Sequence, residues 1–410
     1  MQDLRIAVAG AGPAGLMAGI CLHRDGHQVK IFERFEAPRA VGAGLMLQPT
    51  GLACLARVGL GEAACAAGAR IDRIDGRTRT GGRIFDVSYG ALSPALFGLG
   101  IHRAALFEIL FDEVRRRGIS VTGATEIAGS AVVAGGRVLR DRSGVEIGPF
   151  DLVVDATGTR SPIRAAEGRV RVERPYPYGA LWTVLEIPDG WPHTATLAQV
   201  YDGAHTMAGI LPVGRQPGDP RQLAAMFWSL RRQDLDIWRQ AGLDAWTAKV
   251  ARTWPAIRPF LDQITKPEDL TFATYADMSL RQRFGDRLAF IGDAGRTTSP
   301  QLGQGCNLAL IDATMLAEAL REGSTLPASL AAFAEARRRH STFYSIASRW
   351  LTPFFQSDSR AAGMVRDLTF PLMGHVPYLR REMVRTLAGM KTGLFTSLDP
   401  GLWHETYRLR

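Results

Sequence analysis

The sequence contains few cysteines, and their arrangement indicates neither a disulfide framework nor a metal site. The four in 410 residues, Cys21, Cys54, Cys65 and Cys306, form no CxxC pair and no other metal-ligand spacing. Free thiols of this kind are typical of a reducing compartment. We therefore expect a cytoplasmic protein that holds no metal.

Long apolar runs are also missing. No uninterrupted stretch reaches the roughly 20 residues that a bilayer-spanning helix needs. The apolar start of the chain imitates a secretory signal only in part, because Asp3 precedes it and a glycine-rich turn lies where the apolar core of a signal would be. The sequence predicts no membrane span.

Positive charge exceeds negative charge, but it is spread along the chain. The formal net charge is +9, the positive charge is almost all arginine, and short clusters occur only at residues 115–117 and 337–339. Neither cluster has interleaved aromatic residues or belongs to a recognisable nucleic-acid module. We interpret both as solvated helix faces and expect no nucleic-acid partner.

A dinucleotide-binding pattern occupies residues 4–33. An apolar strand over residues 5–9 leads into a glycine turn over residues 10–15, then a helix, then a second strand over residues 28–32 that is followed by Glu33. A glycine pattern alone would be weak evidence. Here the spacing, the flanking strands and the acidic end all agree with the βαβ fingerprint, which favours a cofactor site over an ordinary turn.

Each residue type in this unit has a physical role. Gly10 permits a tight exit from the strand, Gly12 lets the backbone approach a pyrophosphate, and Gly15 lets the helix pack against the strand. The start of the helix offers free N–H groups and the positive end of its dipole to the pyrophosphate. Glu33 can accept hydrogen bonds from a ribose hydroxyl.

Two later segments of the chain also have the sequence pattern of a nucleotide-binding fold. Residues 151–158 read as a buried strand followed by a glycine turn, and residues 287–293 read as a strand that ends on Asp293. A second glycine-rich turn, over residues 300–307, opens a helix that runs to about residue 320.

Two other regions have a different composition. Residues 176–275 combine alternating strand patterns with six tryptophans, which predicts a separate sheet with a helical insertion. These tryptophans either line a wall for an apolar substrate or are core, and core is the commoner role for any one of them. They are Trp182, Trp191, Trp228, Trp238, Trp246 and Trp254. Beyond residue 341 we predict helices with breaks at Pro353, Pro371 and Pro377.

Three motifs in this order resemble the class A flavoprotein monooxygenases, the family of para-hydroxybenzoate hydroxylase. They are residues 10–15 with Glu33, residues 155–164 and residues 292–312, and the resemblance covers the chain from Arg5 to about Leu320. It implies an α/β fold with a Rossmann-like FAD-binding domain, in a chain that is α+β overall. A mixed or antiparallel sheet would be inserted in this domain as the substrate domain, and a helical region would form the C-terminal part. The implied boundaries are 1–175 plus 276–340 for the FAD-binding domain, 176–275 for the substrate domain, to which 71–101 contribute, and 341–410 for the helical region.

The resemblance implies FAD rather than NAD at the first fingerprint. Glu33 would hold the adenosine ribose, Arg103 the phosphate or ribityl portion, and Asp293 the ribityl hydroxyls. The turn over residues 300–307 would lie along the isoalloxazine ring, where the start of its helix would stabilise negative charge on the reduced flavin. The cofactor-binding residues implied in this way are Gly10, Gly12, Ala14, Gly15, Glu33, Arg34, Gly44, Arg103, Gly158, Asp293, Pro300, Gly303, Gly305 and Asn307.

The reaction is implied as well. NAD(P)H would reduce the flavin, dioxygen would form a C4a-hydroperoxide, and its distal oxygen would hydroxylate a small aromatic or other planar apolar substrate. No side chain is identified as catalytic, because the cofactor carries the chemistry, and the ring-side candidates are Pro300, Gly303 and Gln304. A phenol would profit from a nearby base or acceptor, and the candidates, each more often structural, are His102, Tyr201, His205 and Tyr275. The protein would act as a monomer or a homodimer.

Two positions depart from the family pattern. Thr157 stands where the middle motif usually has an aspartate that is linked to both FAD and the nicotinamide cofactor, and Asp155 lies two residues earlier. Arg296 stands where the family commonly has histidine, and we predict a surface role for it, such as a salt bridge, rather than a fixed cation at the site. Cys306 would lie near the flavin, and we interpret it as a packing residue.

Three other functions stay open at this point. A flavin reductase or dehydrogenase of the same fold would use FAD without inserting oxygen, and Thr157 is compatible with it. A flavin-dependent halogenase would need a tunnel lysine, and the chain has no lysine between Lys30 and Lys249. A non-catalytic FAD-fold binding protein would have no need of the nearly complete turn over residues 300–307.

Overall fold

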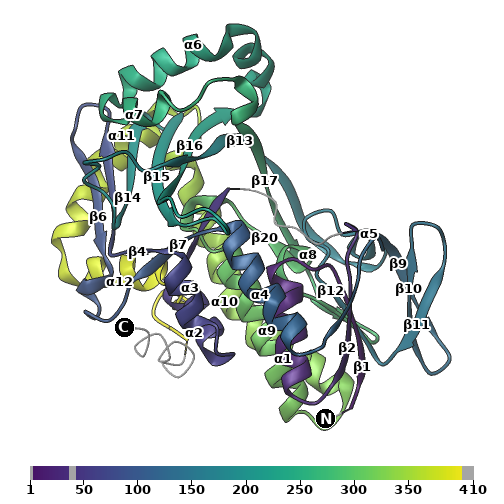
Figure 1. Cartoon of the computed structure of the whole chain (residues 1–410). Coiled ribbons are helices and arrows are strands. Elements are labelled where there is room, and N and C mark those ends of the chain that lie inside the picture. Colours follow the sequence, from purple (N-terminus) through teal and green to yellow (C-terminus); the bar gives the residue numbers. More distant parts are fainter. Residues whose placement is uncertain (1–2, 37–42, 399–410) are drawn as a thin grey trace.

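A computed structural model describes residues 3–36 and 43–398. Residues 1–2, 37–42 and 399–410, which include the end of the predicted C-terminal region, lie outside the described residues. Figure 1 shows a helix-covered sheet around β1 and β12 and a second sheet around β13 and β16, which α6 covers.

The first large sheet has six strands in the order β18-β19-β12-β1-β2-β8. β1 lies in its centre and pairs in parallel with both β2 and β12. Because the carboxyl ends of parallel strands meet at one edge, the glycine turn after β1, the motif after β12 and the turn after β19 come together there. The strands are β1 (Arg5–Ala9), β2 (Gln28–Phe32), β8 (Ser120–Thr122), β12 (Leu152–Asp155), β18 (Phe284–Gly285) and β19 (Leu288–Phe290).

Three helices cover one face of this sheet: α1 (Pro13–Arg24), α4 (Arg103–Arg116) and α9 (Gly305–Glu322) (Figure 1). α1 packs against both of the others, and every residue from Ala14 to Leu22 is buried, as expected for a helix that is apolar on all sides. An antiparallel sheet of β9 (Ile127–Val133), β10 (Gly136–Asp141) and β11 (Glu146–Phe150) packs its apolar side chains against the other face.

The second large sheet has eight strands in the order β20-β17-β13-β16-β15-β14-β5-β6. It is antiparallel except where β5 and β14 pair in parallel. Its strands are β5 (Arg73–Thr78), β6 (Arg83–Ser88), β13 (Val170–Glu186), β14 (Thr196–Asp202), β15 (Thr206–Gly214), β16 (Leu223–Arg231), β17 (Thr271–Leu280) and β20 (Arg296–Thr297). Residues 71–101 thus bring two strands to this sheet, while the predicted domain boundaries remain predictions.

The two faces of the eight-stranded sheet have different coverings. Leu181 and Leu185 of β13 face α6 (Leu235–Thr253) and α7 (Arg258–Leu261), whereas Trp182 between them belongs to the opposite face. The other five tryptophans of the segment, Trp191, Trp228, Trp238, Trp246 and Trp254, all pack on the α6 side. Five of the six are therefore core, and only Trp182 among them stands on the face that turns toward the rest of the chain.

A three-stranded sheet joins the two large ones. It consists of β3 (Gly44–Leu47), β7 (Gly98–His102) and β4 (Ala69–Ile71). α2 (Pro49–Arg57) and α3 (Gly61–Ala67) follow β3 in the chain. Leu47 packs into the core of the six-stranded sheet and Met46 into the core beside the eight-stranded sheet, so β3 lies between the two cores.

The C-terminal helices differ from the predicted breaks. Pro353 lies inside α10 (Leu326–Phe355) and Pro371 inside α11 (Arg360–His375), so the predicted breaks at these two prolines are wrong, whereas Pro377 is the first residue of α12 (Pro377–Leu387). A proline disturbs mainly the turn before it, and each helix continues for about one further turn or less after its proline before it ends.

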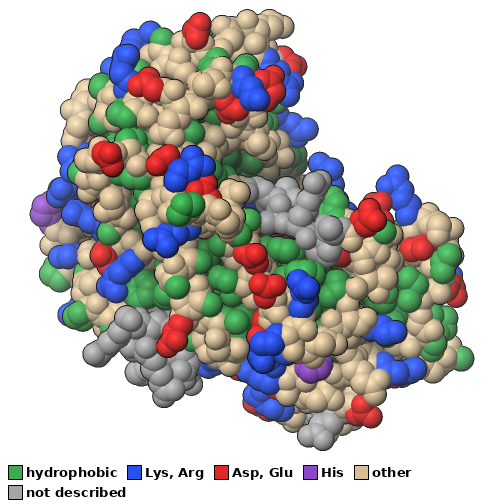
Figure 2. Space-filling view, viewed as in Figure 1, with side chains coloured by type: hydrophobic (Ala, Val, Ile, Leu, Met, Phe, Trp, Pro, Cys, Tyr) green, Lys and Arg blue, Asp and Glu red, His purple; other side chains and the backbone are tan. Residues whose placement is uncertain are grey.

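Arginine and acidic side chains are interspersed on the face shown in Figure 2. The prediction that residues 337–339 form a solvated face is wrong for Arg337, whose side chain is completely buried, while Arg338 is 63% exposed. Consecutive helical residues point about 100° apart, so three in a row cannot share one face. Within the described residues, no helix is both long enough and apolar enough to cross a membrane.

Candidate cofactor and substrate site

The glycine turn after β1 is closed by backbone contacts. Gly10 has φ +103°, and a Cβ on it would lie 2.5 Å from the carbonyl oxygen of Ala156. A Cβ on Gly15 would lie 1.9 Å from the carbonyl oxygen of Gly10. Gly12 is different, because a Cβ there would meet no protein atom within 4 Å. Protein packing therefore requires glycine at positions 10 and 15, and position 12 faces open space.

Glu33 at the end of β2 holds this turn in place. One carboxylate oxygen accepts a hydrogen bond from the backbone N–H of Ala11 at 2.8 Å, and the other accepts one from Phe35 at 3.2 Å. The side chain of the next residue, Arg34, lies over the Phe35 ring, 4.6 Å from its centroid. A carboxylate oxygen can accept more than one hydrogen bond, so Glu33 keeps capacity for a ribose hydroxyl.

The middle motif is organised around a buried acid. Asp155 accepts hydrogen bonds from the hydroxyl of Thr157 at 2.6 Å and from the hydroxyl of Ser161. Ser161 also caps α5 (Pro162–Glu167) by accepting from the N–H of Arg164 at 2.9 Å. Both oxygens of Asp155 accept internal hydrogen bonds and its side chain is fully buried, so this acid does not take the place of the aspartate that the family pattern has two positions later.

Arg164 ties the middle motif to the turn after β19. Its guanidinium donates to the carbonyl oxygen of Gly158 at 3.3 Å and to that of Asp293 at 3.2 Å. The Asp293 side chain is accessible to solvent but lies deep among protein atoms, and desolvation raises its pKa. Gly158 and Asp293, far apart in sequence, are therefore held side by side.

Arg103 lies at the centre of the predicted site. It is exposed at the start of α4, and it lies near enough to Asp293, Cys306 and Tyr275 to lower the pKa of each, against the larger effect of burial, which raises all three. A basic residue at a helix N-terminus is not stabilised by the helix dipole. Residues from three other elements, Tyr275, Asp293 and Cys306, lie near Arg103.

The turn over residues 300–307 is fixed from both sides. Pro300–Leu302 form a single 3-10 turn, which ends on Gly303 at φ +60°. Asn307 is fully buried; it accepts from the N–H of Gln48 at 2.8 Å and donates to the carbonyl oxygens of Met46 at 3.2 Å and Gly303 at 3.0 Å. Asn307 therefore holds the turn against β3, and its described partners are all protein groups.

The C-terminal segment closes the same turn. Gln304 donates to the carbonyl oxygen of Leu387 at 2.7 Å, and Thr50 donates to that of Ala388 at 3.1 Å. Val384, Ala388 and Met390 belong to one apolar cluster with Met46 and Tyr89. Residues 384–390 thus form part of the wall of the site.

The family profile described as FAD binding domain matches residues 3–342. The chain belongs to the class A flavoprotein monooxygenases, the family of para-hydroxybenzoate hydroxylase. It is therefore an FAD-dependent enzyme, and NAD(P)H is the usual electron donor of this family. Membership confirms the family predicted from the three motifs and favours an enzyme over a non-catalytic binding protein.

Individual relatives of this monooxygenase agree with the assignment. It is 28% identical over 381 residues to aurachin C monooxygenase/isomerase of Stigmatella aurantiaca, covering 90% of this chain and 94% of that one. It is 27% identical over 343 residues to 3-amino-4-hydroxybenzoate 2-monooxygenase of Streptomyces cremeus, covering 77% and 78%. Its fold matches Klebsiella pneumoniae HpxO, crystallised with FAD and uric acid, with a TM-score of 0.81, 19% identity and coverage of 96% and 99%.

The residues of this monooxygenase fit FAD. Five of the predicted cofactor-binding positions, Gly12, Arg34, Arg103, Asp293 and Gly305, face open space or are exposed. Gly44 is instead packed against the eight-stranded sheet, where a Cβ would lie 2.4 Å from Val213. In the described residues no group of three metal-ligating side chains occurs.

The candidate bases have mostly structural partners. His102 accepts from the N–H of Ala104 at 3.2 Å and so caps α4, and His205 bonds to Thr206. Tyr201 is buried among Phe85 and Phe355. Tyr275 accepts from the indole N–H of Trp182 at 2.7 Å on the face of the eight-stranded sheet opposite α6. Of the four candidates, Tyr275 alone is paired with the tryptophan of that face.

The prediction of a surface role for Arg296 is wrong. Its guanidinium donates to the carbonyl oxygen of Ser341 at 2.9 Å and to the hydroxyl of Ser345, both on α10. Burial and the neighbouring Arg283 lower its pKa. No pattern near Arg296 predicts that α10 covers this position, because Arg296 and Ser341 are 45 residues apart.

Several structural residues of the site were not predicted. Asp312 lies inside the third motif but had no assigned role, and its partners Arg283 and Arg337 lie outside the motifs. Gln48 was missed as well; its side-chain oxygen accepts from the hydroxyl of Tyr89. Asp312 could have been found as a lone acid at a helical position otherwise occupied by apolar residues.

Proposed function

We propose that this monooxygenase uses NAD(P)H and dioxygen to hydroxylate a small planar aromatic compound. The observation that carries the proposal is the convergence of Arg103, Asp293 and Tyr275 beside the 300–307 turn. This arrangement would put the cofactor residues next to the face of the eight-stranded sheet that carries Trp182, as an enzyme that acts on a ring compound requires.

FAD supplies the redox chemistry when it is bound, and the chain supplies binding and orientation. The proposed contacts are the Gly10–Gly15 turn with Ala14 for the pyrophosphate, Glu33 and Arg34 for the adenosine portion, and Arg103, Gly158 and Asp293 for the phosphate and ribityl portions. Pro300, Gly303 and Gly305 border the ring. Gly44 and Asn307 shape the site through their protein contacts.

The proposed substrate wall is apolar with one polar group. The Trp182 and Phe227 rings lie 4.9 Å apart, and the Tyr275 hydroxyl accepts from Trp182 and keeps its own proton to donate. Burial raises the pKa of Tyr275 to about 12, so the hydroxyl is neutral at physiological pH. It would therefore orient an oxygen or ring nitrogen of the substrate as a donor and would not act as a base.

The relatives indicate the class of ring. The Streptomyces enzyme is named for 3-amino-4-hydroxybenzoate, and HpxO was crystallised with uric acid. Both compounds are planar and carry hydroxyl, amino or ring-nitrogen groups. We propose a substrate of the same kind, held by apolar contact with Trp182 and by a hydrogen bond from Tyr275.

The test is a panel of hydroxylated and amino-substituted benzoates, pyridines and purines added to the purified FAD-loaded protein. We expect one class of ring to accelerate NADH or NADPH oxidation and to gain one labelled oxygen atom under 18O2. A product that forms under 18O2 without the label would contradict the proposal and indicate the reductase or dehydrogenase chemistry.

A further inference from the structure

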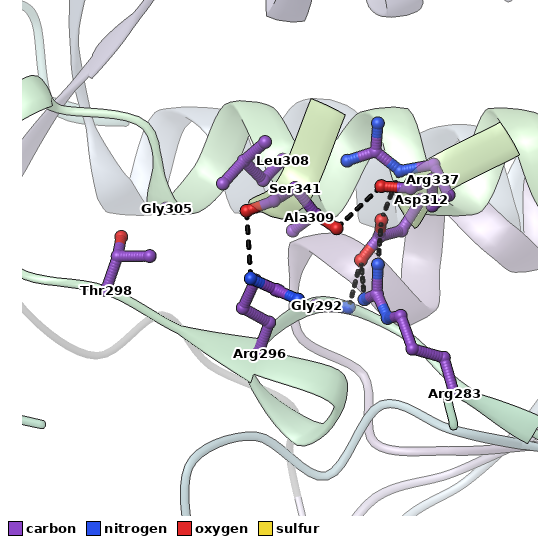
Figure 3. Close-up of a pocket in the computed structure, with 10 residues that line it drawn as sticks. All are labelled: Arg283, Gly292, Arg296, Thr298, Gly305, Leu308, Ala309, Asp312, Arg337 and Ser341. Carbon is purple, nitrogen blue, oxygen red and sulfur yellow. Dashed lines mark hydrogen bonds and ion pairs between the residues drawn. The ribbon is translucent and has the colours of Figure 1, made fainter. Parts of the chain in front are cut away.

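A small cavity lies beside Gly292, the residue that precedes Asp293. Its volume is about 10 Å³, close to that of one water-sized particle. Three arginines line it, Arg283, Arg296 and Arg337, together with the carboxylate of Asp312. Figure 3 shows these side chains converging from the segment before β19, from β20 and from the helices α9 and α10.

The charges around this cavity do not balance. Asp312 pairs with Arg337 at 2.7 Å and with Arg283, so one carboxylate serves two guanidinium groups. Arg296 has no carboxylate partner among its described hydrogen bonds. The next carboxylate that acts on it, Asp277, is paired with Arg349 at 2.6 Å. The ring nitrogen of His340 accepts from Arg337, and burial lowers the pKa of His340 to about 3, so this histidine stays neutral.

Each of the three arginines also has a buried N–H that lacks an acceptor. Among the described residues nothing accepts a hydrogen bond from Arg283 Nε, Arg296 Nε or Arg337 Nη2. Leaving one buried donor unsatisfied costs about 1–3 kcal/mol, and more when the group is charged. Three such donors on side chains that line one cavity indicate that the cavity binds an acceptor.

We propose that this cavity is a binding site for a single small monovalent inorganic anion of the halide type, with chloride as the probe. An anion offsets one of the two unbalanced positive charges and accepts hydrogen bonds from several N–H groups at once. A water molecule would leave both charges in place, and its two lone pairs cannot satisfy three donors. Phosphate, sulfate and carboxylates are too large for a cavity of this size.

The anion would connect three parts of the flavin-binding fold. Gly292 and Gly305 line the same cavity, so the site touches both the turn that carries Asp293 and the first residue of α9. Ser341 of α10 also lines the cavity. The bound anion would stabilise the packing of α10 against these two segments, and this inference does not depend on the identity of the substrate.

The test is crystallographic and uses the FAD-loaded protein. Crystals grown with sodium chloride should give an anomalous peak at long wavelength between Arg283, Arg296 and Arg337, and crystals grown with sodium gluconate should not. Density at this position without anomalous signal in chloride would mean a water molecule and would overturn the proposal. The measurement uses the wild-type chain, so it decides the question even if a variant fails to fold.

A solution experiment uses a matched pair of variants. At constant ionic strength, replacing gluconate by chloride should raise the Tm of the wild type by about 2 °C or more. Arg338→Gln is the control and should show the same increase, because Arg338 is exposed on α10 next to Arg337. Arg296→Gln removes one cation from the cavity and should lose this chloride-specific increase. An equal increase in Arg296→Gln would show that chloride acts elsewhere and would contradict the assignment.

Discussion

The side chain of Asp312 on α9 accepts a hydrogen bond from the backbone N–H of Gly292 at 2.9 Å. This acid is buried and is also the shared partner of Arg283 and Arg337. Gly292 precedes Asp293, so the position of the residue proposed to hold the ribityl chain is set by a buried charge on a different element. Asp312 is thus a positioning residue for the cofactor site.

Asp312→Asn should strongly destabilise the protein. The amide keeps the shape and can still accept from Gly292, but the two buried guanidinium groups of Arg283 and Arg337 lose the carboxylate that they share. Breaking a buried pair in this way costs about 3–5 kcal/mol. Thermal or urea unfolding measures the change. Asp236→Asn is the control: this acid pairs with Arg239 at 3.0 Å, both side chains are exposed, and the expected change is below about 1 kcal/mol.

The stabilisation by Asp312 should depend on pH in one direction. Burial alone would raise the pKa of Asp312, but Arg283 and Arg337 outweigh it and hold the pKa below its usual value. The contribution is therefore complete above the unfolded-state pKa of about 4 and is lost as the pH falls through the lower pKa of the folded state. The stability difference between wild type and Asp312→Asn should be constant from about pH 5 to pH 8 and shrink below about pH 4. A difference that grows on acidification would contradict this assignment.

Two glycine substitutions should have separable effects. A Cβ at position 12 meets no protein atom within 4 Å, and the backbone there, with φ −72°, suits alanine, so Gly12→Ala should fold with unchanged stability. The new methyl group would occupy the space needed for the pyrophosphate, and FAD affinity should fall about tenfold or more. Gly15→Ala, whose Cβ would lie 1.9 Å from the Gly10 oxygen, should lose stability itself. Apoprotein melting and FAD titration distinguish the two, and equal FAD binding by Gly12→Ala would argue against the proposed pyrophosphate position.

Arg103→Gln should weaken FAD binding without unfolding the chain. The side chain is exposed, and loss of one charge-assisted hydrogen bond costs about 1.5–3 kcal/mol, which corresponds to about a 10- to 100-fold increase in Kd. Fluorescence titration of the apoprotein measures it. Arg115→Gln at the other end of α4, where the side chain is 71% exposed, is the matched control and should bind FAD as the wild type does.

Tyr275→Phe should weaken substrate binding more than FAD binding. It removes the acceptor of the Trp182 indole N–H and the donor proposed for the substrate, so KM should rise about five- to tenfold with kcat within about twofold. Tyr178→Phe is the control, because its hydroxyl donates to Asp358 at 2.6 Å and has no proposed role at the site. Because the pKa of Tyr275 is raised to about 12, the wild-type kcat/KM should show no ionisation of this residue below about pH 10. Equal KM values for the two variants would contradict the proposed contact between Tyr275 and the substrate.

The parts of the fold that depend on local pattern were predictable. The predicted strand over residues 5–9 and the second strand over residues 28–32 match β1 and β2, and the glycine turn leads into α1 at Pro13. Strand alternation and glycine spacing are read from neighbouring residues, so no tertiary information is needed. The roles of Gly10 and Gly15 in close backbone packing agree with their predicted roles for the same reason.

The parts that depend on distant partners were not predictable. Arg283 and Arg337 reach Asp312 from 29 and 25 positions away in the sequence, and no periodicity connects the three. Arg296 looked like a surface residue because its own neighbours are polar and small, and only the docking of α10 buries it. A contact between two distant elements leaves no pattern in the sequence of either one. The family resemblance therefore predicted the position of the site, but the structure was needed to find the buried residues that hold it in place.

Three consecutive carbonyl groups near the C-terminus have a consequence for the order in which the site is completed. Leu387, Ala388 and Gly389 accept from Gln304, Thr50 and His340, respectively. During synthesis, the glycine turn and its two strands are complete by residue 33, about 350 residues before these carbonyls emerge. A nascent chain therefore completes the part of the site proposed for adenosine long before it can fix the 300–307 turn from the other side.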